Sequence, residues 1–264
     1  MIDVELRGGP VPPPASGEPA GAGQTPGAPQ VAVIRIDRPE RRNALDIEHC
    51  EGLRAALGRA EDSGARAVVL TGVGSSFCAG ADLDQVYGEA FTDALYNALH
   101  AITDTPLPVI AAVNGPAIGA GLQLALAADL RVAADSAVFA IPTARLGLAV
   151  DPWTLSRLAA LAGGGTARAV VLGCETVPAA RALGVGLVQR AGGLDVALAW
   201  ADELAGLAPL TLAYSKQAFN EATDAGAVPS EAVTAAYEAC WASEDAQEGR
   251  RARAQKRSPV FQGK

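Results

Sequence analysis

The sequence predicts an α/β fold built around one main core. Two apolar, β-branched runs, 65–71 and 108–113, are typical of buried strands, and each is followed by a glycine-rich turn. After the second turn, residues 122–128 are nearly all strong helix formers, so we expect a helix to begin near 119–121. Half of the 264 residues are hydrophobic, and a chain of this length and composition can bury a large core.

The composition limits the kinds of molecule that the protein is expected to bind. A formal net charge of −8 argues against nucleic acid or an anionic membrane surface as the main partner, so a polyanionic ligand would be met by local cations. The four cysteines, at 50, 78, 174 and 240, lack the spacing of a metal site, and no export signal opens the chain. We therefore expect reduced thiols in a cytoplasmic protein. No apolar run approaches the roughly 20 residues that a membrane span needs.

The N-terminal region predicts a hairpin with a long connection. Residues 2–6 and 31–36 read as its two strands. Between them, residues 8–29 are packed with proline, glycine and alanine, which favours an insertion without fixed structure over a functional peptide.

The remaining elements follow from hydrophobic periodicity. We expect a helix from 43 to 62 and another over 84–103, where Tyr87, Phe91, Leu95 and Leu99 form a stripe that faces the core or lines a tunnel. Further strands are expected at 130–133 and 137–141, further helices at 153–162 and 167–172, a helical turn and short strand within 177–190, and helices at 194–207, 210–225, 230–242 and 244–256.

The two glycine-rich turns have the chemistry of an oxyanion site. The first amides of a helix lack partners inside it and lie at the positive end of its dipole. Small residues at 119, 120 and 121 would let a ligand approach the backbone closely. The alternative interpretation is a packing turn between a core strand and a core helix.

Three motifs give a resemblance to a known family. FCAGADL at 77–83 and NGPAIGAG at 114–121, with RPERRNAL at 38–45 upstream, resemble the crotonase, or enoyl-CoA hydratase/isomerase, superfamily, from about Val31 to the C-terminus. The resemblance implies a ClpP-like spiral of repeated ββα units over 1–195 and a C-terminal helical region, 196–264, that closes the site and packs between subunits. It also implies that the Ala81 and Ala120 amides bind the thioester carbonyl of an acyl-CoA, each contributing roughly 3–4 kcal/mol.

The resemblance implies further ligand contacts. Coenzyme A thioesters would be bound as ligand or substrate, with no permanent cofactor and no metal, by homotrimers or dimers of trimers. For Arg41 and Arg42 the alternative is a solvated charge run, and for Phe261 and Lys264 a frayed terminus. The residues placed at the coenzyme A site are Arg41, Arg42, Ala44, Ala79, Asp82, Leu83, Phe261 and Lys264.

The acid–base residues of a hydratase are missing. In the family pattern two carboxylates activate water and move the α-proton, and their positions here are occupied by Gln123 and Thr143. Neither side chain titrates near neutral pH. The sequence thus looks like a catalytically silent actinobacterial member that binds long-chain acyl-CoA in lipid metabolism and has little or no hydratase activity.

Asp151 supports an alternative in which the protein is an active CoA-thioester enzyme, a hydratase, isomerase or hydrolase. If apolar neighbours desolvated this carboxyl, its pKa would rise and it could act as base or nucleophile. It equally suits a helix N-cap, since Pro152 would occupy the first helical position. His49 and His100 lie near no motif and are expected to be surface or packing residues, and a scaffold without ligand is a third possibility.

Overall fold

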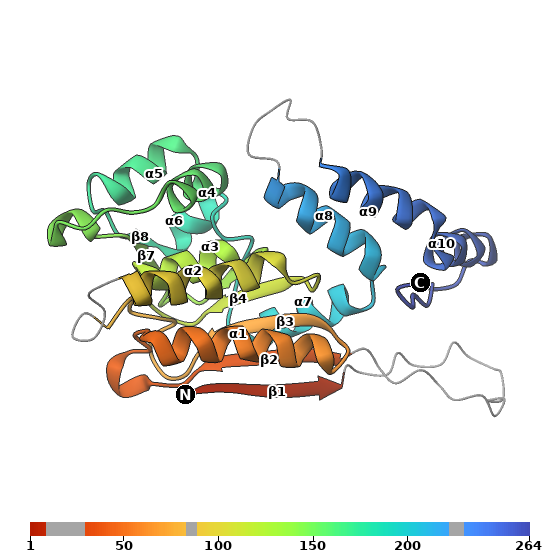
Figure 1. Ribbon diagram of the computed structural model, residues 1–264, viewed down its shortest axis with the longest axis horizontal. Coiled ribbons are helices and arrows are strands. Elements are labelled where there is room, and N and C mark those ends of the chain that lie inside the picture. Colours follow the sequence, from red (N-terminus) through yellow and green to blue (C-terminus); the bar gives the residue numbers. More distant parts are fainter. Residues whose placement is uncertain (9–29, 83–88, 222–229) are drawn as a thin grey trace.

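The computed structural model describes residues 1–8, 30–82, 89–221 and 230–264 (Figure 1). These residues form the predicted α/β fold, with a central sheet, a smaller second sheet and a group of C-terminal helices. The predicted insertion at 8–29 lies outside the described residues except for Gly8. Leu83 and Tyr87 also lie outside them.

The main sheet contains the longest apolar runs of the chain. Strands β1 and β2 pair antiparallel, with Ile2 opposite Ile36, which confirms the predicted hairpin. All other neighbours in this sheet are parallel, and burial of its inner strands on both faces explains their continuous hydrophobic sequence. In the sheet order β1-β2-β3-β4-β6-β9, the strands are Ile2–Gly8, Gln30–Ile36, Ala65–Gly72, Val109–Val113, Leu130–Ala133 and Arg190–Ala191.

The chain alternates between this sheet and a second, three-stranded one made of β5 (Ala117–Ile118), β7 (Val138–Ala140) and β8 (Val177–Pro178). β4 leads into β5 and then into helix α3 (Ala120–Ala127), and β6 leads into β7 and later into α4 (Pro152–Ala162). Each of these two turns of the chain therefore adds one strand to each sheet and then a helix. This is the repeated ββα spiral that the resemblance implies.

Helices cover both faces of the main sheet. α1 (Ile47–Asp62) and α2 (Glu89–Asp104) pack together on one face, and α7 (Leu194–Ala205) packs against β2, β3, β4 and β6 on the other (Figure 1). The predicted division of the chain at residue 195 falls inside α7, and it stays a prediction. The remaining helices are η1 (Pro39–Arg41), η2 (Thr143–Leu146), α5 (Gly164–Val171), α6 (Ala179–Gly184), α8 (Pro209–Glu221), α9 (Glu231–Ala242) and α10 (Glu244–Gln255).

The segment before α1 differs from the prediction. The helix begins at Ile47, after the N-cap Asp46, so the predicted start at Asn43 is wrong. Asn43 has a left-handed backbone, with φ of 60°, and its buried side chain donates to the carbonyls of Val73 and Ser76 at 2.9 and 2.7 Å. Asn43 therefore holds the turn after β3 instead of extending the helix.

Helix α3 is almost completely buried. Of its eight residues, all of which are described, Gln123 alone is not buried. At its C-terminal end the buried guanidinium of Arg131 donates to the carbonyls of Ala125 and Ala128, at 3.1 and 2.8 Å. Burial lowers the pKa of Arg131 to about 10, which still leaves it charged at neutral pH. A cation is favourable there because it faces the negative end of the helix dipole.

Helix α8 contacts the core of its own chain through the buried cation of Lys216 and through Asn220, which donates to the Thr103 carbonyl at 2.9 Å. The ammonium of Lys216 lies 2.9 Å from the carboxylate of Asp129, and it donates to the carbonyls of Ile102 and Leu107 at 2.8 and 2.9 Å. The predicted helix at 210–225 is confirmed as far as Glu221, the last described residue of that stretch.

All four cysteines are unpaired, and Cys50, Cys78 and Cys174 are buried. Over the described ranges, no single helix is long and apolar enough to cross a bilayer; only the bent pair α7 and α8 passes such a test together, on length and composition alone.

The two glycine turns touch through backbone atoms. A Cβ atom added to Gly121 would lie 2.1 Å from the carbonyl oxygen of Cys78, and one added to Gly115 would lie 2.1 Å from that of Ser75. Both distances are far below van der Waals contact and involve backbone. These positions therefore require glycine for packing.

We expect Gly121→Ala to lower the free energy of unfolding by roughly 1–3 kcal/mol or more, because the turns must separate to admit a methyl group. Gly58→Ala is the matched control, since Gly58 lies inside α1 and has no atom within 4 Å of the added Cβ. That change should raise stability by up to about 1 kcal/mol. Urea unfolding of both variants checks this, and equal effects would contradict the packing explanation.

Candidate functional site

The first turn presents the amide of Ala81. Leu45 forms a parallel bridge with Ala81, in which the Leu45 amide donates to Gly80 at 2.8 Å and the Asp82 amide donates to Leu45 at 2.7 Å. In a parallel bridge the residue between the two bonded neighbours directs its own N–H to the opposite side. The Ala81 amide therefore faces away from Leu45.

The second turn presents the amide of Ala120. This residue is the first of α3, so its N–H has no acceptor within the helix. Gly119 has a φ of 54°, and a Cβ added to Gly80 would lie 2.9 Å from the Ile118 carbonyl and 3.9 Å from the Ala120 nitrogen. The two predicted donor residues are thus brought to one place by turns that touch each other.

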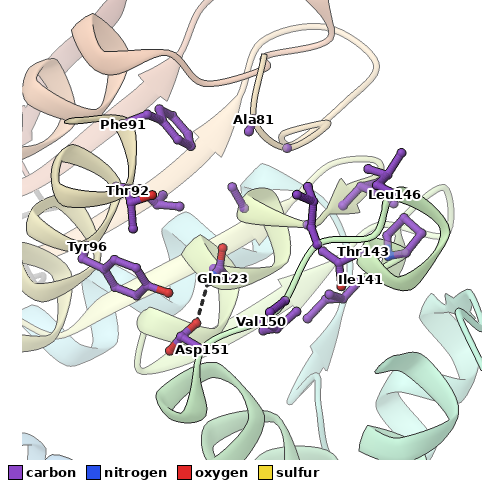
Figure 2. A pocket seen from close by; sticks show the side chains of 18 of the residues that line it. Ala81, Phe91, Thr92, Tyr96, Gln123, Ile141, Thr143, Leu146, Val150 and Asp151 are labelled. Carbon is purple, nitrogen blue, oxygen red and sulfur yellow. Dashed lines mark hydrogen bonds between the residues drawn. The ribbon is translucent and has the colours of Figure 1, made fainter. Parts of the chain in front are cut away.

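Ala81 and Ala120 line a common cavity of about 620 Å³. One wall is α2 and the opposite wall is the segment 141–151, with α3 between them (Figure 2). Most of the lining is apolar, as in sites for small organic ligands. The lining residues include Ala79, Gly80, Phe91, Leu95, Tyr96, Ile118, Gln123, Ile141, Thr143, Leu146, Leu148, Val150 and Asp151.

Asp151 is an ionised carboxylate within a hydrogen-bonded group. It caps α4 by accepting from the Thr154 amide at 2.9 Å, and it also accepts from the Thr154 hydroxyl and from the Gln123 amide, the latter at 3.1 Å. Burial raises the pKa of Asp151, but the two Thr154 bonds and the Tyr96 hydroxyl outweigh it, so the net pKa lies below the usual value. The raised pKa that the enzymatic alternative requires is therefore not found.

Asp151 also fixes which way the Gln123 amide points. A carboxylate only accepts hydrogen bonds, so the nitrogen of Gln123 must face it. The same nitrogen donates its second hydrogen bond to the Thr154 hydroxyl oxygen, at 2.8 Å. Figure 2 shows the oxygen of Gln123 on the side away from Asp151. The cavity thus receives a neutral acceptor at a position where a hydratase needs a titrating group.

Thr143 lies across the cavity from Gln123, at the start of η2 (Figure 2). Its hydroxyl does not titrate near neutral pH. The two positions that carry carboxylates in the family pattern therefore face the cavity with an amide and a hydroxyl.

Sequence reasoning missed the polar residues on α2 that line the cavity, which are Glu89, Thr92, Asp93 and Tyr96. Tyr96 lies beside the predicted stripe and donates to Asp151; burial, and then Asp151 itself, raise its pKa, so it stays protonated. Glu89 and Asp93 lie at the rim of the cavity with exposed side chains. The predicted stripe residues Phe91, Leu95 and Leu99 are buried, and the first two also line the cavity.

The segment 38–45 is brought against the first turn. Ala79 lines the cavity and donates to the Arg42 carbonyl at 3.0 Å, so the backbone at Arg41 and Arg42 adjoins the turn while both side chains are exposed. Ala44 is buried. Asp82 is buried beside Arg38, with which it forms an ion pair at 3.0 Å.

The C-terminal residues lie elsewhere. The Phe261 carbonyl accepts from Arg66, at the start of β3, and the Lys264 carbonyl accepts from the Asp245 amide. The cavity lies beyond the other end of β3. Within one chain, Phe261 and Lys264 are therefore not brought to the cavity that holds Ala81.

The histidines match their predicted role as packing or surface residues, since His49 is buried and bonded to Asp46, and His100 is exposed. Across the described part of the chain, no group of three His, Cys, Asp or Glu side chains is placed to hold a metal ion.

Comparison with known proteins gives one consistent result. A family model described as enoyl-CoA hydratase/isomerase matches residues 27–264. The chain is 46% identical to the "probable enoyl-CoA hydratase echA6" of Mycobacterium tuberculosis over 239 residues, covering 89% of this chain and 97% of that protein.

Solved structures agree. The crystal structure of an enoyl-CoA hydratase from Bacillus anthracis is 30% identical, with a TM-score of 0.79, and covers 89% of this chain and 96% of its own. A "probable enoyl-CoA hydratase/isomerase" from Mycobacterium abscessus is 34% identical, with a TM-score of 0.78 and the same coverage.

The lowered pKa of Asp151 predicts an acid-sensitive contribution to stability. This contribution is complete above the unfolded carboxyl pKa of about 3.9 and is lost as the pH falls through the lower folded value. Asp151→Asn retains a capping side chain but removes the titration. Unfolding of both proteins between about pH 5 and pH 2 should show a flatter profile for the variant, and parallel profiles would contradict the assignment.

Proposed function

Because this chain belongs to the enoyl-CoA hydratase/isomerase family, we propose that it binds acyl-CoA thioesters and has little or no hydratase activity of its own. The observation that carries this proposal is the combination, in one cavity, of two turn amides without a backbone acceptor among the described residues and the neutral pair Gln123 and Thr143. Binding of a thioester needs donors such as these amides. Hydration also needs a pair of titrating side chains, which Gln123 and Thr143 do not provide.

The two amides fit a thioester oxygen. Ala81 and Ala120 both line the cavity, and each adjoins a glycine that packs closely on backbone, Gly80 against the Ile118 carbonyl and Gly121 against the Cys78 carbonyl. Donors fixed before binding need no reorganisation when the oxygen gains negative charge. This supports their role as the carbonyl-binding pair.

The polar side chains between the walls of the cavity explain why we expect little proton transfer to a bound thioester. General acid–base catalysis needs a group that titrates near the working pH. Gln123 presents a carbonyl oxygen, Thr143 a hydroxyl, and Tyr96 a phenol with a raised pKa. Asp151 is ionised, but hydrogen bonds from Thr154, Tyr96 and Gln123 already stabilise its carboxylate.

A long, apolar acyl chain suits the rest of the cavity. Its walls carry Phe91, Leu95, Ile141 and Val150, and Leu146 and Leu148 remain largely exposed on the segment that forms one wall. Apolar carbons of a ligand would cover these leucines, which gives a favourable burial of about 25 cal/mol per Å². We therefore propose long-chain acyl-CoA as the ligand class, within the fatty-acid or lipid metabolism of the cytoplasm.

Arg41 and Arg42 support coenzyme A as the carrier, because exposed guanidinium groups beside the first turn suit its phosphates. The oligomer that we propose, a trimer or a dimer of trimers, would place Phe261 and Lys264 at a neighbouring chain's site. Exposed aromatic side chains on α8 and α9, Phe219 at 79% and Trp241 at 64%, offer the apolar surface for such packing.

A second candidate function is that of an active CoA-thioester enzyme with Asp151 as a nucleophile. The raised pKa expected from the sequence is absent, but a carboxylate attacks in its ionised form, which the lowered pKa of Asp151 favours. Its place in the cavity favours this idea. Loss of a CoA-dependent turnover in Asp151→Asn, without loss of stability, would establish it.

We expect the protein to bind long-chain acyl-CoA more tightly than free coenzyme A, while hydrating crotonyl-CoA far more slowly than a true hydratase. Each carboxylate of an acid–base pair contributes about 10²–10⁴ in rate, and both are absent. Calorimetry and a spectrophotometric hydration assay on one preparation measure the two quantities. Turnover at ordinary hydratase rates would overturn the proposal.

Installing both carboxylates should create activity. We expect the double variant Gln123→Glu with Thr143→Glu to hydrate crotonyl-CoA on the order of 10²-fold faster than the natural chain, because two titrating groups then face the cavity. Thr143→Glu alone is the matched control and should gain little. Equal rates in the single and double variants would show that position 123 does not reach the substrate.

A further inference from the structure

We propose that Arg38 is a positioning residue that keeps the thioester carbonyl site electrically favourable by neutralising Asp82, the residue next to the Ala81 amide. This inference rests on the proposed function, since it concerns the same carbonyl site. Arg38 itself does not line the cavity, so it would act through Asp82.

Arg38 is held by several acceptors at once. Its side chain is 14% exposed, and its Nη1 atom lies 3.0 Å from Asp82 Oδ2 and 3.2 Å from Asp46 Oδ2. The same nitrogen donates to the Ala44 carbonyl at 3.2 Å. One cationic nitrogen therefore serves two carboxylates, of which only Asp82 adjoins the first turn.

Asp82 depends on this cation. Its side chain is 5% exposed, and its Oδ2 atom accepts no hydrogen bond from the described residues, because the 3.0 Å approach of Arg38 lacks hydrogen-bond alignment. A buried carboxylate with an oxygen that accepts no hydrogen bond is costly unless a counter-charge lies close. Among the described residues, Arg38 supplies that charge.

The position of Asp82 makes this charge matter for ligand binding. Its carboxylate belongs to the residue directly after Ala81, which lines the cavity and whose amide faces away from Leu45. A thioester oxygen drawn to that amide gains partial negative charge, and an uncompensated carboxylate nearby would repel it. Such repulsion is weakly screened in a buried site.

The path of the turn has supports other than the guanidinium. Asn43 holds the turn by donating to the Val73 and Ser76 carbonyls, and the Leu45 bridge holds it on the other side. Loss of the Arg38 charge should therefore change the field at the carbonyl site more than the backbone around it. This separates an electrostatic role from a purely structural one.

The test is the infrared stretching frequency of the thioester carbonyl in bound acyl-CoA labelled with ¹³C at that carbon. In Arg38→Gln the downshift on binding should shrink, and the preference for acyl-CoA over free coenzyme A should fall on the order of fivefold. Adding Asp82→Asn to Arg38→Gln should restore the downshift, whereas adding Asp46→Asn, the matched control, should not.

A second variant keeps the inference testable if Arg38→Gln fails to fold. Asp82→Asn alone removes the opposing charge and leaves Arg38 in place, so the downshift should equal or exceed that of the natural chain, and Asp46→Asn should leave it unchanged. A smaller downshift in Asp82→Asn, or equal rescue by both asparagine substitutions, would overturn the inference. If the natural chain shows no downshift and no preference for acyl-CoA, the proposed function itself fails.

Discussion

The structure depends on the contact between two turns that meet with no side chain between them. Gly121 lies so close to the Cys78 carbonyl that a single methyl group would not fit, and Gly115 meets Ser75 in the same way. This contact sets the positions of Ala81 and Ala120 relative to each other. Because the two residues are 39 positions apart in the chain, only the tertiary packing of the turns can align their amides. The spiral places β3 and β4 side by side, so the turns that follow them meet.

A second constraint decides what the aligned amides can do. Asp151 is a carboxylate that keeps its charge, since Thr154 and Tyr96 donate to it, and that charge compels Gln123 to offer its oxygen to the cavity. A group with a fixed orientation and no proton to exchange can hold a ligand but cannot move protons for it. The same carboxylate caps α4, so the fold and the chemistry of the cavity share one residue.

Much of the fold was predictable from local sequence, and the reasons are visible in particular residues. Glycine and proline mark the turns, and Asp151 before Pro152 marks the start of α4 as an N-cap. Asn43 was misassigned to a helix because its long-range bonds to Val73 and Ser76 outweigh local propensity. The pairs Gln123–Asp151 and Arg38–Asp82 join distant segments, and no spacing in the sequence marks such contacts.

Helix α3 has an evolutionary consequence. Every residue of it except Gln123 is enclosed by neighbours, so almost any change along it would require the surrounding core to adapt. Gln123 is the one position of α3 where an exchange of side chains would not require the core to repack, and its cost would be the lost bonds to Asp151 and Thr154. Divergence of chemistry on this scaffold should therefore concentrate at that single site and its contacts, while the rest of the helix changes slowly.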